Sequence, residues 1–371
     1  MSWLEATENR VARWRSERGA EPPKRVVIAD DQMKADIAYR LACEGTALLW
    51  RGDFQNARQL LLAMARRADR KPQKPAASPV EAFNFHRQAQ AQRARTLSML
   101  LIPLESDFSI PLRRAPDIRQ ACSEVYGVGD EVSVTSLREL LGIVGAHEWR
   151  KKGVEITALG ARIHPHYGVY SPVRGEYVAL VAQAPLPATT LAFDIGTGTG
   201  VLAAVLARRG VRQVIATDQE PRALACAREN LARLGLTKQV TVVEADLFPE
   251  GRAPLVVCNP PWIPARPSAT IEHAVYDPES RMLRGFLGGL AAHLTADGEG
   301  WLILSDLAEH LGLRSRDELM EAIAAAGLRV VDRTEVRPHH PRVTDPTDPL
   351  HAARVAEKTS LWRLATISSI K

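Results

Sequence analysis

One stretch decides the fold of this chain, residues 191–200, which runs Leu191-Ala192-Phe193-Asp194-Ile195-Gly196-Thr197-Gly198-Thr199-Gly200. Its first half is apolar and predicts the end of a buried strand, and its second half predicts a glycine turn. The three glycines remove the side chains that would keep a ligand away from the backbone of the turn. A helix is expected to follow from Val201 to Arg209, with arginines at the end where cations suit the helix dipole. The stretch therefore predicts a strand, a ligand-binding turn and a helix.

An acid two residues before the first glycine indicates which ligand the turn takes. A dinucleotide site prefers Gly-x-Gly-x-x-Gly, whereas Asp194, Gly196, Gly198 and Gly200 form the pattern Asp-x-Gly-x-Gly-x-Gly. The carboxylate would repel a pyrophosphate, but it favours a cation such as the amino group of an amino acid. The pattern thus favours S-adenosylmethionine (SAM) over NAD. The alternative is a purely structural glycine turn in another α/β protein.

Three further predicted strands end in residues that suit the same ligand. The strand 214–218 ends at Asp218, about 20 residues beyond the turn, where a ribose diol would lie. The strand 240–247 ends in Asp246 and Leu247, with the carboxylate placed to accept from an adenine amine. The strand 255–258 runs into Asn259-Pro260-Pro261-Trp262. Because open α/β sheets bind ligands at the carboxyl ends of their strands, we expect these residues to share one site.

Residues 191–306, and more loosely the chain to residue 371, resemble a class I SAM-dependent methyltransferase. The Asn-Pro-Pro-aromatic motif resembles the subgroup that methylates planar nitrogens, which includes small-domain ribosomal RNA guanine methyltransferases, adenine methyltransferases and release-factor glutamine methyltransferases. The resemblance implies a Rossmann-like α/β domain over residues 188–371, with a seven-stranded, mostly parallel sheet and helices on both faces. It also implies SAM as cofactor, bound by Asp194, Gly196, Thr197, Gly198, Gly200, Asp218, Asp246 and Leu247.

The same resemblance gives the Asn-Pro-Pro-Trp motif a catalytic role. In the family, the oxygen of the residue at Asn259 and the backbone carbonyl at Pro260 accept hydrogen bonds from the amine that is methylated, and stabilise the charge that develops on it. Pro261 stiffens the loop by fixing its backbone angle. Trp262 offers a face on which a base or an amide can stack, worth about 1–3 kcal/mol for a base. Tyr or Phe is more usual at this position, so the substrate stays open.

A bridge segment, residues 166–187, precedes the catalytic domain. Its residues 172–176 resemble the Pro-x-Arg-x-x-Glu segment of glutamine methyltransferases with altered spacing, which implies that Arg174 and Glu176 lie near SAM. The alternative is a helix cap with a surface ion pair. His164 and His166 lack a cysteine or acid at ligand spacing, so we expect no metal site.

Two loops could contribute to the pocket. His273, Tyr276 and Asp277 follow the Asn-Pro-Pro-Trp motif and could take a proton, although loop scaffolding is favoured. The segment 338–358 joins the two last predicted strands, and its proline-rich part could close on a substrate. Its role is left open by the sequence.

Residues 1–165 are expected to form a mainly helical, basic domain that recognises the substrate, and whether this part is one domain or two is left open. Residues 132–163 could form a winged-helix-like element or a lid, and Trp149 stands beside basic residues that could contact nucleic acid. The predicted helices cover 1–20, a segment carrying Ile37 to Leu49, 54–70 and 80–104, with a proline-rich linker at 71–79.

Composition and charge limit the functional classes. Residues 1–187 carry 27 Lys and Arg against 21 Asp and Glu, while residues 188–371 carry 21 against 22. The basic front half fits an RNA partner. No apolar run approaches the roughly 18 residues of a membrane helix, and residues 1–5 do not begin a signal peptide. The four cysteines are expected as buried free thiols in a reducing compartment, which predicts the cytoplasm.

These observations lead to a ranked set of functions. The first is N-methylation of an exocyclic amine in RNA, above all ribosomal RNA, with the basic front half binding the RNA. The second is methylation of a glutamine amide in a protein. A small-molecule methyltransferase and a degenerate, non-catalytic domain are weaker alternatives, since all four motifs are intact. The sequence leaves open the target atom and the oligomeric state.

Overall fold

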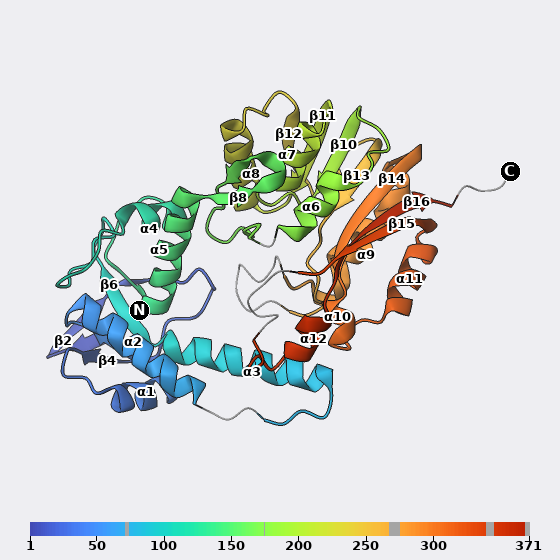
Figure 1. Cartoon of the computed structure of the whole chain (residues 1–371). Helices are drawn as coiled ribbons and strands as arrows, with labels where there is room; N and C mark the ends of the chain where they lie inside the picture. The colour runs from blue at the N-terminus through green and yellow to red at the C-terminus, as the bar shows by residue number, and fades with distance from the viewer. Residues whose placement is uncertain (71–73, 174, 267–274, 339–344, 368–371) are drawn as a thin grey trace. The chain divides into compact units, whose positions relative to one another are not determined.

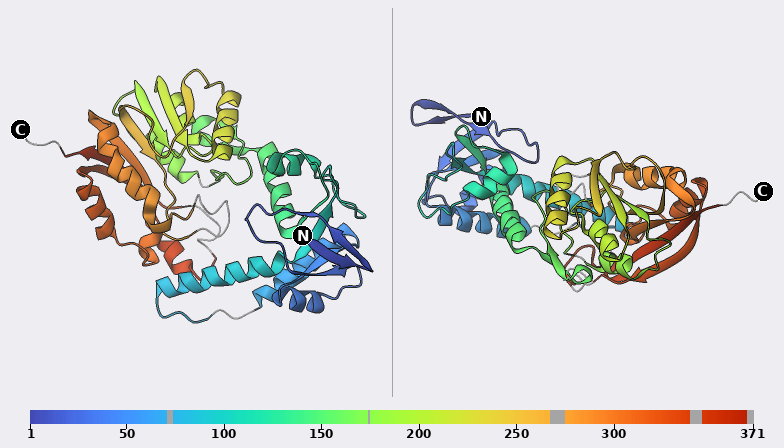
Figure 2. Two further views of the ribbon diagram at one scale, coloured as in Figure 1. Left: turned by 180° about the vertical axis from the view of Figure 1, so that it is seen from behind. Right: turned by 90° about the horizontal axis from the view of Figure 1, so that it is seen from above.

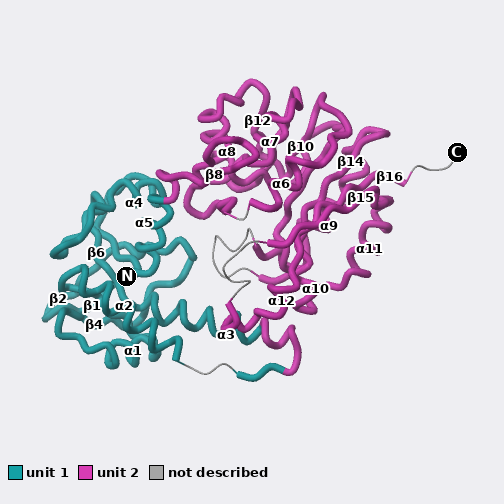
Figure 3. The backbone as a smooth tube through the Cα atoms, viewed as in Figure 1, with its two compact units in different colours: residues 1–76, 84–148 teal, residues 77–83, 149–371 magenta. Residues whose placement is uncertain are grey.

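The computed structural model describes residues 1–70, 74–173, 175–266, 275–338 and 345–367. The chain divides into two compact units, and each is discontinuous in sequence (Figure 3). Unit 1 comprises Met1–Ala76 and Asn84–Glu148, and unit 2 comprises Ala77–Phe83 and Trp149–Lys371. The division falls at 148/149 rather than at the expected 165/166, because Val154, Ile156 and Ile163 pack in one core cluster with strands of unit 2. Among the described residues, no helix has both the length and the apolar character needed to cross a bilayer.

Unit 2 is built on a seven-stranded mixed sheet in the order β12-β11-β10-β13-β14-β16-β15 (Figure 1). The pairs from β12 to β14 are parallel, whereas β16 runs antiparallel to β14 and β15. The strands are β10 (Leu191–Ile195), β11 (Gln213–Asp218), β12 (Val240–Glu244), β13 (Ala253–Cys258), β14 (Leu294–Ser305), β15 (Leu328–Val336) and β16 (Thr359–Thr366). The four strands expected around the site are found in this unit, but β12 ends at Glu244, so Asp246 and Leu247 follow the strand instead of ending it.

Helices cover both faces of this sheet (Figures 1 and 2). Alternate residues of β13 show the two faces, since Leu255 and Val257 pack in one core cluster and Val256 and Cys258 in another. The first cluster includes α6 (Glu176–Gln183), α7 (Val201–Arg208) and part of α8 (Pro221–Arg233), and the second includes α9 (Arg281–His293) and α11 (Arg316–Ala325). The shorter elements are β8 (Val154–Ile156), η1 (Thr157–Leu159), β9 (Ala161–Ile163), η3 (Pro278–Ser280), α10 (Leu307–His310) and α12 (His351–Ala356).

Unit 1 is an α/β unit, so the expectation of a mainly helical front part was wrong. Its five-stranded sheet has the order β3-β7-β6-β5-β4, and a separate hairpin joins β1 to β2. The strands are β1 (Ser2–Glu5), β2 (Glu8–Val11), β3 (Arg13–Trp14), β4 (Arg25–Ala29), β5 (Thr46–Trp50), β6 (Leu100–Leu104) and β7 (Ser133–Ser136). The helices that include unit 1 residues are α1 (Ala35–Cys43), α2 (Phe54–Asp69), α3 (Pro79–Leu97), α4 (Arg119–Tyr126) and α5 (Leu137–Lys152).

The errors in unit 1 have physical causes. Residues 1–20 form strands, with Trp3 buried and its neighbour Leu4 66% exposed, which is the alternation of a strand rather than a helix stripe. Segments 46–50 and 100–104 are buried throughout, and a short apolar run does not distinguish a strand from a buried helix. The segment 132–163 forms no separate winged helix, because β7 belongs to the five-stranded sheet. Cys43 is exposed, unlike the other three cysteines, so the expectation that all four are buried was wrong.

The two faces of the unit 1 sheet are covered differently. Leu48 and Trp50 of β5 pack on one face with residues of α1, α2, α4 and α5. Leu49, the residue between them, packs on the other face with Trp3 and Ala12, which belong to the hairpin and its end. The hairpin therefore takes the place that helices hold on the opposite face.

Candidate functional site

The candidate site lies where β10 and β13 leave the sheet side by side. Ile195 pairs with Cys258 in the parallel register, so Gly196 and Asn259, the next residues, begin two adjacent loops. From β10 the chain continues through β11 to β12 on one side, whereas from β13 it continues to β14 on the other. Such a switch point opens a crevice at the carboxyl ends of the strands, where α/β sheets bind ligands.

All three glycines of the turn have a positive φ, and at two of them an added methyl group would also meet a neighbouring element. Gly196 has a φ of +69°, and a methyl group added there would lie 2.5 Å from Met282 Cε of α9. Gly200 has a φ of +80°, and an added methyl group would lie 3.3 Å from the Cα of Ala227 in α8. A methyl group on Gly198 would meet no described atom within 4 Å. The turn is therefore held closely on two sides and open at Gly198.

The buried side chain of Asp194 stabilises this turn through hydrogen bonds. Its side chain is 1% exposed, and Oδ2 accepts hydrogen bonds from Thr197 Oγ1 at 2.7 Å and from the Ala203 N–H at 3.0 Å. Burial raises the pKa of Asp194 to about 6, against the lowering effect of these two hydrogen bonds. The sequence predicted a carboxylate that meets a cationic ligand, whereas this oxygen joins the turn to the first turn of α7.

Asp218 and Leu247 lie at the carboxyl ends of the neighbouring strands. Asp218 accepts from the Gly198 N–H at 3.0 Å through Oδ2 and from the Glu220 N–H at 3.0 Å through Oδ1. The carbonyl of Leu247, a residue with a φ of +75°, accepts from Thr217 Oγ1 at 2.6 Å. These contacts join the ends of β10, β11 and β12 into one edge.

Asp246 lies on the surface of the same edge. Its carboxylate forms an ion pair with Arg281 at 3.2 Å, and both side chains are largely exposed, at 64% and 74%. An exposed pair of this kind contributes about 0–1 kcal/mol, so a ligand can displace the arginine at little cost.

The Asn-Pro-Pro-Trp motif carries an internal hydrogen bond. Trp262 Nε1 donates to Asn259 Oδ1 at 2.9 Å. The Trp262 ring is half-buried and packs against the core clusters of both sheet faces, while Pro260 is buried. The amide oxygen of Asn259 is thereby oriented by a side chain of its own loop.

Asp277 positions α9 against the glycine turn. Its carboxylate is 5% exposed and accepts from the N–H groups of Met282 at 3.0 Å and Leu283 at 3.1 Å. These are N–H groups at the start of α9, which lack partners within the helix. Because Met282 also approaches Gly196, the carboxylate fixes the residue that packs on the turn. Asp277 therefore anchors the start of α9.

The other candidates from that loop and from the bridge are placed as follows. Tyr276 packs against Phe83, with ring centroids 6.5 Å apart, while His273 lies outside the described residues. Arg174 also lies outside the described residues. Glu176 is in the first turn of α6, and burial raises the pKa of its neighbour Tyr177. The segment 339–344 of the long loop is likewise outside the described part of the chain.

His164 and His166 belong to a hydrogen-bond network centred on α8. His166 Nε2 lies 2.7 Å from Glu229, which also pairs with Arg150 at 2.6 Å. Although burial opposes it, hydrogen bonds from Arg233, His166 and Arg150 lower the pKa of Glu229 to about 2. The described residues contain no group of three His, Cys, Asp or Glu side chains with the arrangement of a metal site.

Sequence reasoning missed two residues that shape the site. Met282 contacts the turn from 86 positions away in the chain, a relationship that no local pattern encodes. Asn230 is 1% exposed, and its Nδ2 donates to the Thr199 carbonyl at 3.1 Å, which ties α8 to the turn. A polar residue on the otherwise apolar buried face of α8 was the available signal for the second.

Several basic residues of α3 and α5 are engaged by neighbouring side chains. Arg93 of α3 pairs with Asp69 at 2.7 Å, and Arg95 donates to Gln92. Trp149 is 49% exposed, with Lys152 Nζ 5.6 Å from its ring centroid. Arg150 beside it pairs with Glu229.

The chain shares part of its length with known methyltransferases. Residues 161–316 match the family described as methyltransferase small domain. The chain is 30% identical over 143 residues to a tRNA1(Val) (adenine(37)-N6)-methyltransferase of Shewanella sp. (strain MR-4), covering 36% of this chain and 60% of that protein. It is 33% identical over 173 residues to a release factor glutamine methyltransferase of Cereibacter sphaeroides, covering 43% and 60%. The chain thus spans about three fifths of the length of these curated relatives.

A comparison with solved structures gives matches of low sequence identity. A ribosomal protein L11 methylase of Lactobacillus delbrueckii subsp. bulgaricus is 18% identical, with a TM-score of 0.37 over 53% of this chain and 81% of that one.

Proposed function

We propose that this chain is a SAM-dependent N-methyltransferase that transfers a methyl group to a planar nitrogen. The observation that carries the proposal is the register of β10 with β13, which places the loop of Asn259 beside the glycine turn at Gly196. The matches to a methyltransferase family and to methyltransferases of two substrate classes support it.

The residues of the site fit SAM. Gly198 leaves room against the turn, and the carboxylates of Asp218 and Asp246 stand at the ends of the next two strands. Asp218 would accept from the ribose diol and Asp246 from the adenine amine, with Gly196, Thr197, Gly200 and Leu247 shaping the contact surface. Asp194 would act on the cofactor through the turn that it holds. When bound, SAM supplies a methyl group that its sulfonium has already activated.

The protein's task is then to hold a poor nucleophile in line. The lone pair of an exocyclic amine or a side-chain amide is delocalised into its π system. Asn259 Oδ1 and the Pro260 carbonyl would accept the two amine hydrogens and stabilise the positive charge that develops on nitrogen. The face of Trp262 would support the plane of the substrate. Pro261 would keep the loop from relaxing away from this geometry.

The favoured substrate is an exocyclic amine of an RNA base, with ribosomal RNA as the first candidate. Unit 1 would recognise the RNA. The basic balance of residues 1–187 and the relative whose name describes tRNA adenine methylation support this choice. The free cysteines fit a reducing compartment, so we place the reaction in the cytoplasm.

The second candidate substrate is a glutamine amide of a protein. Two observations favour it: the relative named as a release factor glutamine methyltransferase, and the pairing of unit 1 arginines with acids. Arg113, Arg114 and Arg119 pair with Asp31, Asp53 and Asp117, which reduces the positive charge available to phosphates.

The test is methyl transfer from labelled SAM into a lysate of cells that lack the protein, followed by RNase or protease. Label that RNase removes supports RNA, and label that only protease removes moves the glutamine amide to first place. Asn259→Ala should lower transfer at least 100-fold while SAM still binds. Asn9→Ala, an exposed asparagine of the hairpin, should leave transfer unchanged. Full activity of Asn259→Ala would refute the role given to Asn259.

A further inference from the structure

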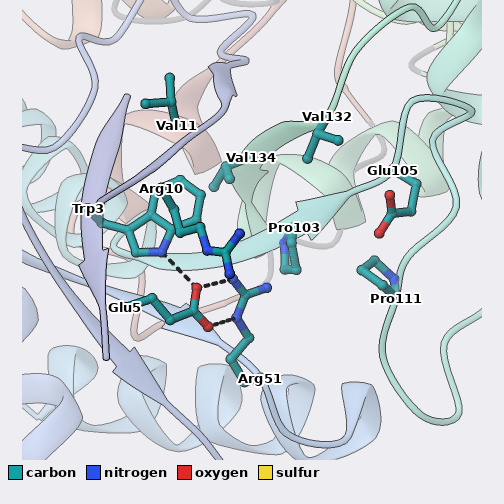
Figure 4. A pocket seen from close by; sticks show the side chains of 10 residues that line it. All are labelled: Trp3, Glu5, Arg10, Val11, Arg51, Pro103, Glu105, Pro111, Val132 and Val134. Carbon is teal, nitrogen blue, oxygen red and sulfur yellow. Dashed lines mark hydrogen bonds and ion pairs between the residues drawn. The ribbon is translucent and has the colours of Figure 1, made fainter. Parts of the chain in front are cut away.

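Unit 1 contains a pocket of about 370 Å³ that no part of the proposed reaction uses (Figure 4). It is formed at the carboxyl ends of the parallel strands β5 and β6, where Arg51 and Glu105 follow the last strand residues. Pro103 and Val134 are on the sheet face that the hairpin partly covers. The remaining lining residues are Trp3, Glu5, Arg10, Val11, Pro111 and Val132. Both the size and the position are those of ligand sites in α/β units.

Two arginines, Arg10 and Arg51, stand at one end of this pocket, and the carboxylate of Glu5 holds Arg51 in place. Glu5 accepts from Arg51 Nε at 2.8 Å, from Arg51 Nη2 at 2.6 Å and from Trp3 Nε1 at 3.0 Å. The hydrogen bonds from Arg51 lower the pKa of Glu5 below its usual value, and the nearby charge of Arg10 acts in the same direction. Arg51 therefore pairs with Glu5, and Arg10 lies near enough for its charge to act on the same carboxylate, so two guanidinium groups stand at this end of the pocket.

Arg10 is available to a ligand at little cost. It pairs with Glu8 at 2.6 Å, but both side chains are more than half exposed and Glu8 is outside the lining. Such an exposed pair contributes about 0–1 kcal/mol. Arg51, in contrast, is fixed by its bidentate contact, so its guanidinium is already oriented.

The opposite end presents an acceptor. The Glu105 side chain is exposed, and it makes no hydrogen bond or ion pair with the described residues. Between the two ends, Pro103 and Val134 give the pocket an apolar middle (Figure 4). Val11 and Val132, at the rim, are 73% and 47% exposed.

We propose that this pocket binds a nucleotide. Arg10 and Arg51 take the phosphate, the base lies along Pro103 and Val134, and Glu105 accepts from an exocyclic amine of the base. A carboxylate discriminates in this way between cytosine, which presents an amine donor, and uracil, which presents a carbonyl acceptor. The pocket would hold the 5′-phosphate at one end and the amine-bearing base at the other. The assignment of the nucleotide to RNA rests on the proposed function, RNA methylation.

The charges argue against an apolar side chain of a protein in the same place. Such a group would cover the charged Glu105 without supplying a donor to it, and it would offer no acceptor that could replace Glu8 at Arg10. Covered polar groups without partners cost free energy. A nucleotide supplies both.

The experiment measures binding to the full chain by titration calorimetry, without methyl transfer. The probes are cytidine 5′-monophosphate, uridine 5′-monophosphate and a single-stranded cytidine oligonucleotide. Cytidine monophosphate should bind at least 3-fold more tightly than uridine monophosphate. Arg10→Ala should weaken both at least 10-fold, Glu105→Gln should remove the preference for cytidine, and Arg40→Ala, an exposed arginine of α1 outside the lining, should change neither.

Tighter binding of the oligonucleotide than of the monophosphate supports RNA as the source, and equal or weaker binding supports a free nucleotide. Failure of all three probes to bind, or binding that Arg10→Ala and Glu105→Gln leave unchanged, overturns the proposal. If the parent chain binds the probes but transfers no methyl group in the lysate test, the proposed function is refuted and the nucleotide site stands.

Discussion

The indole N–H of Trp262 donates to Oδ1 of Asn259 over 2.9 Å, and this contact fixes which way the asparagine amide faces. An amide oxygen has two acceptor positions, so the second one stays open to a substrate amine. A tyrosine or phenylalanine ring at residue 262 would have no donor at the indole nitrogen's place. The tryptophan therefore adds a positioning contact to the stacking face.

Trp262→Phe is expected to lower kcat for methyl transfer about 3- to 10-fold, because the aromatic face stays while a hydrogen bond worth about 0.5–1.5 kcal/mol is lost. The KM for SAM should change less than 2-fold, since the ring does not depend on the donor for its packing. Steady-state kinetics with the RNA or protein fraction that accepts the label in the lysate test would measure both. Trp14→Phe, which also removes an indole hydrogen bond but lies outside the site, is the matched control and should show the kcat of the parent. An unchanged kcat would show that the contact is incidental.

The buried carboxyl of Asp194 gives the stability of unit 2 a pH dependence. Its pKa rises from an ordinary 3.8 to about 6 on folding, so ionisation costs stability as the pH rises through this interval. The cost is up to about 3 kcal/mol. An asparagine side chain at this position cannot ionise, so the melting temperature of Asp194→Asn relative to the parent should rise between pH 4 and pH 7. Thermal unfolding followed by circular dichroism measures the difference, and a difference that falls with pH would contradict the burial argument.

Removing the carboxylate of Asp277 should loosen α9. Asp277→Ala leaves the N–H groups of Met282 and Leu283 without their acceptor, at a cost of about 1–2 kcal/mol, and should lower the melting temperature. SAM affinity should fall as well, because Met282 packs on Gly196. Asp277→Asn keeps an acceptor and should lose less on both measures. Equal losses for the two variants would mean that the negative charge of Asp277, and not its hydrogen bonds, stabilises the start of α9.

Alanine substitutions at two glycines of the turn should affect the stability of the fold and the affinity for SAM to different degrees. Gly200→Ala combines positive φ with a 3.3 Å approach to the Ala227 backbone, so its loss of stability should exceed the roughly 1–2 kcal/mol of backbone strain alone. Gly198→Ala carries only the strain, but its methyl group would project into the open side of the turn. It should therefore weaken SAM binding at a smaller cost in melting temperature. If Gly200→Ala weakened SAM binding more than Gly198→Ala did, SAM would not bind against the open side of the turn.

The strands of unit 2 could be predicted because their patterns are local. The strand before Gly196 is apolar and is followed by a glycine turn. The next strand ends in a polar residue, Asp218, and the strand that ends at Cys258 is followed by one, Asn259. The site follows from those patterns, since parallel strands share a carboxyl edge. What could not be predicted is distant in sequence, such as the packing of Met282 on Gly196.

Unit 1 resisted prediction for a different reason. Its strand 46–50 is wholly buried and shows no alternation, and its hairpin places Trp3 inward against residues of β5 and β6. Such strands are stabilised by pairing with partners far along the chain, so the local pattern leaves helix and strand equally open. The Trp262 contact was missed because the ring was expected to serve only the substrate.

The start of α3 has a consequence for how this protein can be divided. Phe83 is in unit 2, where it packs with Ile263 just after the Asn-Pro-Pro-Trp motif and with Leu307 of α10. A gene fragment that begins at residue 149 would encode the whole seven-stranded sheet and still omit this anchor of the substrate loop. A copy that starts at residue 149 would therefore keep the sheet but lack the Phe83 packing against the loop that follows β13.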